Sequence, residues 1–134
     1  MEGKRRKARE IVLKLLYGLE CNPKSPEEAI DDYCSLNEIE AVDKFAFEHF
    51  KGIVENKESI DQFIKNYAKN WKIERIALID KNIMRIAIFE MINLPEIPHV
   101  VSINEAVDIA KKFSKNDSGK FVNGILDKIN KDLS

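Results

Sequence analysis

A run of basic residues near the N-terminus is the first segment whose residue types suit a chemical task. Lysine or arginine occupies every position from 4 to 7, and another arginine follows two residues later; the set is Lys4, Arg5, Arg6, Lys7 and Arg9. Like charges packed this closely cost free energy unless a counter-charge offsets them. A guanidinium binds a phosphate through two parallel hydrogen bonds, so the run suits a polyanion such as a nucleic acid.

An aromatic residue follows the basic run on the same predicted helix. At 100° per residue, Arg6, Glu10, Leu13 and Tyr17 fall within about 60° of one another on a flank away from the apolar stripe, with Arg9 between that flank and the core. Planar side chains stack on unpaired bases, so this flank predicts binding of single-stranded RNA. The predicted contacts are Lys4, Arg5, Arg6, Arg9 and Tyr17. The alternative is that Tyr17 only packs and that the arginines keep the terminus solvated.

A polar turn near residue 117 is a second candidate. The segment Asn116-Asp117-Ser118-Gly119-Lys120 precedes a predicted helix that opens with Phe121. The N–H groups at a helix N-terminus favour anions, so Lys120 and Phe121 are further candidates for contact with RNA. The alternative is that the turn only caps the helix and that Phe121 lies in the core.

No set of residues suggests catalysis. The sequence has no glycine-rich phosphate loop and no nucleophile-elbow motif. Asp80, Arg85 and Glu90 lie in an almost wholly apolar segment, and buried charges must be paired, so we expect structural ion pairs. His49 falls on an apolar face and is expected to be a packed core histidine.

Cysteines and histidines do not indicate a metal site either. Cys21 and Cys34 lie in no CxxC pattern, and His49 and His99 are not at metal-ligand spacing from them. We expect free, core-like thiols in a reducing cytoplasm, and neither a metal nor another cofactor. No apolar run approaches the roughly 18 residues that span a bilayer, and no signal peptide is expected, so the predicted location is cytoplasmic.

The elements that must position these residues are helices. Of 134 residues 44% are hydrophobic, and the 5 glycines and 4 prolines are too few for an all-β sandwich or barrel. Apolar residues recur with the helical period of 3.6. This period predicts an all-α fold of about seven helices in one domain. Residues 41–67 are compatible with one bent helix or with two separate ones.

Two capping boxes and one apolar segment refine this prediction. Ser25-Pro26-Glu27-Glu28 has the serine, proline and glutamate that begin a helix. Ser102-Ile103-Asn104-Glu105 repeats the box, so we expect another helix to begin at Ser102. Residues 76–92 are apolar almost all round, which predicts a central helix packed by several others.

The net charge of −1 hides an uneven distribution. Residues 1–14 hold six basic and two acidic residues, 25–62 hold eleven acids and three lysines, and 111–131 hold six lysines and two aspartates. A nearly neutral protein with two basic ends can bind a polyanion locally. The alternative is a set of solvated helix faces.

Four blocks of the sequence resemble the NusB family. Residues 103–113 (INEAVDIAKKF) and 120–128 (KFVNGILDK) resemble the family's C-terminal signature at its usual separation. Residues 80–90 resemble its central helix, and residues 5–17 its arginine-rich first helix. The resemblance is strong over roughly 73–131 and 5–17, and weak over 21–70.

The resemblance implies an all-helical fold of two packed sub-bundles, approximately residues 1–70 and 71–134, around a central helix. It implies that the protein is a bacterial transcription antitermination factor and not an enzyme. Such a factor binds boxA RNA together with ribosomal protein NusE and joins other Nus factors on RNA polymerase. By position it points to Arg5, Arg6, Arg9 and Tyr17 as RNA contacts, and more weakly to Lys120 and Phe121. Asp117 matches the family's functional surface and Asp80 an acidic position on the side associated with NusE, so both are predicted partner contacts.

Two other functions are compatible with the sequence. The same helical module occurs as the N-terminal domain of a ribosomal RNA cytosine methyltransferase, although this chain ends at Ser134 without the glycine-rich cofactor loop. The second is a purely protein-binding adaptor, including a homodimer whose contact masks the RNA surface.

Overall fold

The computed structural model describes residues 2–115 and 117–133, and all regular elements within them are helical. In chain order they are α1 (Glu2–Cys21), α2 (Pro26–Leu36), α3 (Lys44–Glu55), α4 (Lys57–Tyr67), the short 3-10 helix η1 (Ile73–Arg75), α5 (Leu78–Asn93), α6 (His99–Phe113) and α7 (Ser118–Leu133). The seven α-helices confirm the all-α prediction. No helix of the described residues is long and apolar enough to cross a membrane.

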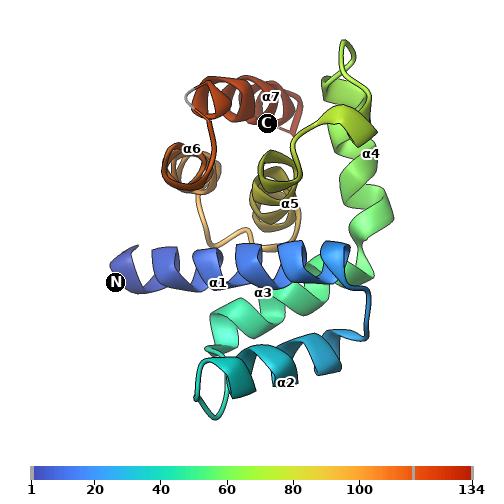
Figure 1. Cartoon of the computed structure of the whole chain (residues 1–134). Helices are drawn as coiled ribbons and strands as arrows, with labels where there is room; N and C mark the ends of the chain where they lie inside the picture. Colours follow the sequence, from blue (N-terminus) through green and yellow to red (C-terminus); the bar gives the residue numbers. More distant parts are fainter. Residues whose placement is uncertain (1, 116, 134) are drawn as a thin grey trace.

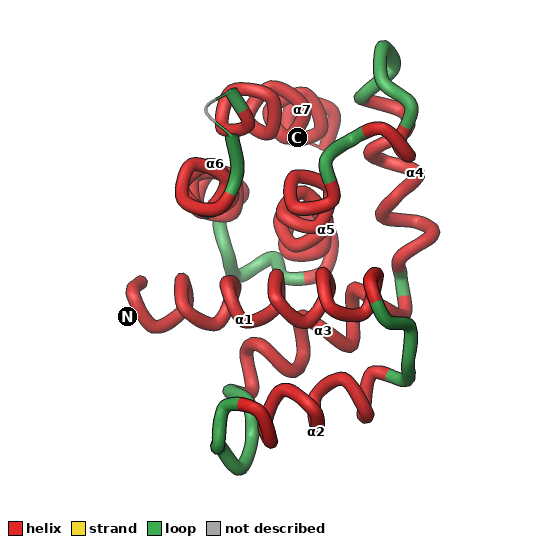
Figure 2. The backbone as a smooth tube through the Cα atoms, in the orientation of Figure 1, coloured by secondary structure: helices red, strands yellow, loops and turns green. Residues whose placement is uncertain are grey.

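Helix α5 is the centre of the molecule (Figure 1). It contacts α1, α3, α4, α6 and α7, while α2 packs on α1 and α3. Figure 2 shows the same arrangement, with α6 and α7 on one side of α5, α4 on another, and α1 and α3 crossing below. Eleven residues of α5 are buried, which confirms the predicted central helix.

Local capping explains where the early helices begin. The Ser25 hydroxyl accepts a hydrogen bond from the N–H of Glu28 at 3.1 Å, and the Glu28 carboxylate accepts one from the N–H of Ser25 at 3.2 Å, so this capping box is confirmed. Helix α3 begins at Lys44 and not at 41, because the Asp43 carboxylate accepts from the N–H of Phe45 at 3.1 Å. Asn56 separates α3 from α4, so two helices form.

The predicted helix start at Ser102 is wrong. Helix α6 begins at His99, directly after Pro98, so Ser102 and Glu105 lie inside the helix and are buried. The Ser102 hydroxyl donates a hydrogen bond to the Glu90 carboxylate at 2.6 Å and does not cap a helix. Helix α7 begins at Ser118, within the predicted turn; Asn116 lies outside the described residues.

A single cluster of buried apolar residues contains members from all seven α-helices. Helix α5 belongs to this cluster along most of its length. The division into sub-bundles at about residue 70 stays a prediction, because nothing in the packing separates the two parts.

Candidate nucleic-acid interface

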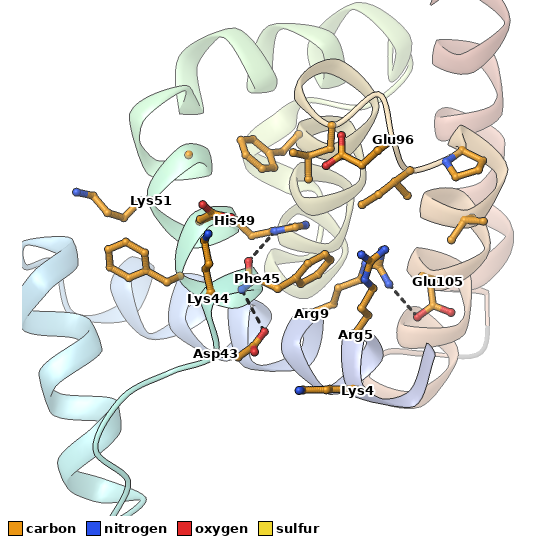
Figure 3. Close-up of a pocket in the computed structure, with 18 of the residues that line it drawn as sticks. Lys4, Arg5, Arg9, Asp43, Lys44, Phe45, His49, Lys51, Glu96 and Glu105 are labelled. Atoms are coloured by element: carbon orange, nitrogen blue, oxygen red, sulfur yellow. Dashed lines mark hydrogen bonds and ion pairs between the residues drawn. The ribbon is translucent and has the colours of Figure 1, made fainter. Parts of the chain in front are cut away.

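Arg9 lies in the core and not at the surface. Only 3% of its side chain is exposed. Its Nε and Nη2 donate to the two carboxylate oxygens of Glu90 at 2.7 and 3.0 Å, and its Nη1 donates to Glu105 at 3.3 Å. Figure 3 shows Arg9 directed between α3 and Glu105. This corrects the prediction that Arg9 contacts RNA, because its guanidinium is already bonded to two carboxylates.

Glu90 holds several helices through one buried carboxylate. Besides Arg9, it is bonded to the Ser102 hydroxyl and lies 2.8 Å from Nε2 of His49. Burial alone raises the pKa of a carboxyl, but the hydrogen bonds from His49, Arg9 and Ser102 outweigh it and lower the pKa of Glu90 to about 2. His49 is buried, and its Nδ1 lies 2.8 Å from the carbonyl oxygen of Phe45. The predicted core histidine and the structural role of Glu90 are both confirmed.

Arg6 lies between the core and the solvent. Its Nε and Nη2 donate to the two oxygens of Glu105 at 2.7 and 2.6 Å, and Nη2 also donates to Asp108 at 2.8 Å. This bidentate hydrogen bond is the main reason that the pKa of Glu105 is lowered, and burial opposes it. The Arg6 side chain remains 35% exposed, so it is less free than the sequence predicts.

The next residue on the flank that contains Arg6 is also bonded to α6. Glu10 pairs with Lys112 of α6 at 3.1 Å, and Leu13 is buried. The prediction of a free flank is therefore wrong for Glu10 and Leu13, whereas Tyr17 is exposed. The reason is that α1 packs on α2, α3 and α5, and its side chains also form ion pairs with α6.

Three cations of the basic run at the start of α1 remain exposed. Lys4, Arg5 and Lys7 are open to solvent, and none forms an ion pair with a side chain that the structure describes. The Arg5 guanidinium carbon lies 5.1 Å from the centre of the Phe45 ring, a distance at which a cation is attracted to an aromatic face. These three residues are the part of the basic run that is available to a phosphate.

An open groove of about 1090 Å³ adjoins Lys4 and Arg5, between α1, α3 and the segment 94–101 (Figure 3). Its α3 wall carries Lys44, Phe47 and Lys51, which the sequence analysis missed. Their spacing of three and four residues marks one helix face, but the acidic total of residues 25–62 concealed it. Lys51 lies 3.6 Å from Glu27, so its charge is shared with an acid.

Tyr17 is not part of this groove. It is 43% exposed, on the same helix as Arg5. Twelve residues of α-helix separate the two, which places them about 18 Å apart along the axis. Only an extended ligand can contact both, so the structure does not bring Tyr17 together with the exposed cations.

The second predicted site gathers several of its residues around one cavity of about 710 Å³. Asp80, Asp117 and Phe121 line it together with Trp71, whereas Lys120 is exposed outside the lining. Asp80 is only 6% exposed, and its carboxylate accepts hydrogen bonds from the hydroxyls of Ser114 at 2.8 Å and Ser118 at 3.0 Å. Asp80 therefore holds the turn before α7, and its predicted role as a partner contact is revised.

The remaining buried charge on α5 has a structural role. Arg85 donates to Asp61 of α4 at 2.7 and 2.9 Å and to Glu20 of α1 at 2.6 Å. Burial lowers the pKa of an arginine, but these two carboxylates outweigh it and raise the pKa of Arg85. The expected ion pairing is confirmed for Arg85 and Glu90, while Asp80 is bonded to serine hydroxyls. The three residues belong to separate clusters.

Neither cysteine is part of a site. Both thiols are free; Cys34 is buried as expected, whereas Cys21 is exposed at the end of α1. Among the residues that the structure describes, no group of three or more histidine, cysteine, aspartate or glutamate side chains could hold a metal ion.

Comparison with known sequences finds one family over nearly the whole chain. The model of the NusB family matches residues 6–131. The transcription antitermination protein NusB of Desulforapulum autotrophicum is 43% identical over 130 residues, which cover 95% of this chain and 91% of that protein. The protein of the same name from Bacillus cereus is 42% identical over 127 residues, which cover 94% of this chain and 96% of that protein.

Solved structures agree with the sequences. NusB of T. maritima superposes with a TM-score of 0.82 at 36% identity, over 95% of this chain and 90% of that chain. A chain in the crystal structure of the antitermination factors NusB and NusE in complex with double-stranded RNA superposes with a TM-score of 0.84 at 28% identity, over 98% and 99% of the two chains. This chain belongs to the NusB family, which its relatives identify as transcription antitermination proteins.

Proposed function

We propose that this protein acts in transcription antitermination by binding RNA through the exposed cations of α1, in partnership with the ribosomal protein NusE. One observation carries the proposal: Lys4, Arg5 and Lys7 stand exposed at one end of α1 without a described carboxylate partner. The related structure that contains NusB, NusE and RNA supports the choice of ligand and partner.

The other arginines of the run make this end of α1 rigid. Arg9 ties α1 to Glu90 of α5, and Arg6 ties it to Glu105 of α6. A helix held in this way presents its free cations without the entropy loss of ordering the backbone that carries them. Arg6 can add a phosphate contact, because its pair with the exposed Asp108 contributes little free energy.

The proposed ligand is the boxA element of nascent RNA, with NusE adding contact surface and other Nus factors and RNA polymerase completing the assembly. The protein then acts by binding and not as an enzyme, in the cytoplasm, where bacterial transcription takes place. A homodimer that masks the RNA surface stays a prediction, which light scattering with and without RNA tests.

The first experiment is a titration followed by fluorescence anisotropy. A labelled boxA-type single strand, a scrambled strand and a duplex of the same length are each titrated with the protein, with and without purified NusE, at two salt concentrations. We expect selective binding of the boxA strand that NusE strengthens. For about 3–5 phosphate contacts, the logarithm of the affinity falls with the logarithm of salt with a slope of about −2 to −3.5. Equal binding of all three RNAs, indifferent to NusE, contradicts the proposal.

Variants then locate the contact. Arg5→Ala and Lys4→Ala each remove one exposed cation, so each is expected to weaken binding and to reduce the salt slope by about 0.7. Lys128→Ala removes an exposed cation from α7 and is the matched control, expected to leave both quantities unchanged. Unchanged affinity in the α1 variants places the RNA elsewhere on the molecule.

A further inference from the structure

Trp71 is a large aromatic side chain that the fold leaves open. It lies between α4 and η1 and is 57% exposed. Its backbone N–H donates to the carbonyl of Ala68 at 2.9 Å, which holds the turn that carries it. Its ring meets that of Phe121 of α7 edge-on, with ring centres 5.6 Å apart and planes at 75°. This edge-to-face geometry is favourable, so Phe121 fixes the indole while more than half of the Trp71 surface stays in solvent.

The cavity beside these rings combines aromatic and charged walls. Arg75 and Lys115 line it, and neither forms an ion pair with another described side chain. Asp117 lines it as well, and its carboxylate likewise lacks an ion-pair partner among the described residues. The remaining acid, Asp80, is already bonded to Ser114 and Ser118. The cavity therefore offers a stacking surface, two unpaired cations and one free acceptor.

A nucleotide uses all three of these features. Its base stacks on an aromatic ring, its phosphate attracts the cations, and a carboxylate accepts a hydrogen bond from an exocyclic amino group. An apolar peptide segment would leave both cations and the acceptor without partners in a partly desolvated site, which costs free energy. The charges therefore favour a nucleotide over a purely apolar occupant.

We propose that this cavity binds an unpaired base of the RNA and that Trp71 stacks on it. The inference rests on the proposed function and adds to it a base-binding residue and the class of strand. A base within a duplex is stacked on both faces and cannot enter, so the occupant is single-stranded RNA. Trp71 then contributes to affinity separately from the α1 cations, because it contacts the base and they contact phosphates.

The chain contains one tryptophan, so its intrinsic fluorescence reports on this cavity alone. The protein is titrated with a boxA-type single strand and with the same strand annealed to its complement, while the anisotropy of the labelled RNA is measured in parallel. Stacking of a base on the indole quenches its emission. We expect quenching by the single strand that saturates together with the anisotropy, and no quenching by the duplex.

Variants separate stacking from folding. Trp71→Ala is expected to weaken binding of the single strand at least about fivefold, whereas Trp71→Phe keeps a ring and most of the affinity. Leu36→Ala, which shortens a highly exposed apolar side chain on α2, is the control and is expected to bind normally. Thermal unfolding followed by circular dichroism shows that each variant is folded.

Three outcomes overturn the inference in distinguishable ways. If anisotropy reports binding while Trp71 emission is unchanged and Trp71→Ala binds normally, the proposed function stands and the base pocket fails. If NusE alone quenches Trp71 and RNA adds nothing, the cavity is a protein contact. If no RNA binds with or without NusE, the proposed function fails and the base pocket fails with it.

Discussion

Arg5 and Arg9 are one helical turn apart in the same basic run, and the structure gives them opposite tasks. Arg5 is exposed and lies against the Phe45 ring, whereas Arg9 is buried between Glu90 and Glu105. Removal of one partner from a buried ion pair leaves an uncompensated charge in the core, which is far more costly than the loss of an exposed one. The two residues can therefore be told apart by stability and by affinity.

We expect Arg9→Ala to lower the free energy of unfolding by about 3–5 kcal/mol, because Glu90 is left buried without its cation. Arg5→Ala is the matched variant on the same helix and is expected to change stability by less than about 1 kcal/mol while it weakens RNA binding. Urea unfolding of both variants measures the difference. An Arg9→Ala protein as stable as the parent would show that the core tolerates an unpaired Glu90.

The pKa of Glu90 predicts how stability depends on pH. Its pKa in the folded state is about 2, against 4.5 for an ordinary glutamate. Because the folded pKa is lowered, the charged form stabilises the fold above the unfolded pKa, and this contribution is lost as the pH falls from about 4.5 to about 2. Glu90→Gln lacks this contribution at every pH.

We therefore expect the stability gap between the parent and Glu90→Gln to narrow as the pH falls across this interval. Urea midpoints at several pH values between 7 and 2.5 measure it. Glu40→Gln, which changes an exposed glutamate, is the control, and its urea midpoint should change with pH in the same way as that of the parent. A gap that stays constant with pH would show that the Glu90 carboxylate does not drive the acid response.

At this scale the sequence allows the residue types of the site to be predicted but not their exposure. Arg5 and Arg9 have the same chemistry and, four residues apart, lie on nearly the same side of α1. They differ in what the fold places around them, because only Arg9 is enclosed by the carboxylates of Glu90 and Glu105. Arg9 is next to Ala8, a residue of the apolar stripe. Its burial, however, depends on an ion pair with Glu90, which is 81 residues away in the sequence. Periodicity contains no information on such a partner. Trp71 was missed for a related reason, since only the fold places it beside Phe121.

At the scale of elements, the close contact of α3 with α5 depends on Gly52. A methyl group at this position would lie 2.3 Å from Cε1 of Phe89, a buried residue whose ring also packs on His49. Either the Phe89 ring or the two helix backbones would have to shift to relieve this overlap. Gly18 of α1 is the opposite case, because nothing lies within 4 Å of an added methyl group.

We expect Gly52→Ala to destabilise the protein by about 1–3 kcal/mol through overpacking, although alanine favours a helix over glycine. Gly18→Ala carries the same chemical change without the overlap and is expected to stabilise the protein by about 0.4–1 kcal/mol. Thermal unfolding of the two variants compares them directly. A stabilising effect at both positions would show that α3 can shift away from Phe89 at little cost.

The helices themselves follow from the sequence more completely than their boundaries. Every helical region was predicted, because burial on one face imposes the 3.6 period whatever the partner helix is, but the pattern left open whether residues 41–67 form one helix or two. The boundary at Ser102 was mistaken because a capping serine and a buried serine have the same local sequence. Ser25 has no buried carboxylate to bind and caps its helix, whereas Ser102 donates to Glu90 and lies inside one.

At the scale of the whole molecule, two buried ionic clusters connect the parts that the sequence would divide at about residue 70. Arg85 of α5 bonds Glu20 of α1 and Asp61 of α4. Glu90 of the same helix bonds Arg9 of α1 and His49 of α3, and also Ser102 of α6. Residues 1–70 thus supply partners for charges of α5 that would otherwise be buried alone.

We therefore expect the chain to unfold in a single cooperative transition and not as two sub-bundles. A fragment of residues 1–70 lacks α5 and exposes the apolar faces of α1, α3 and α4, so it should not fold alone. Calorimetry measures the first expectation through agreement of the calorimetric and van't Hoff enthalpies. Arg85→Ala lowers the midpoint by removing the shared cation, but the transition should stay single because the common apolar core remains. Two separate transitions in the parent protein would mean that the sub-bundles are independent folding units, with α5 belonging to only one of them.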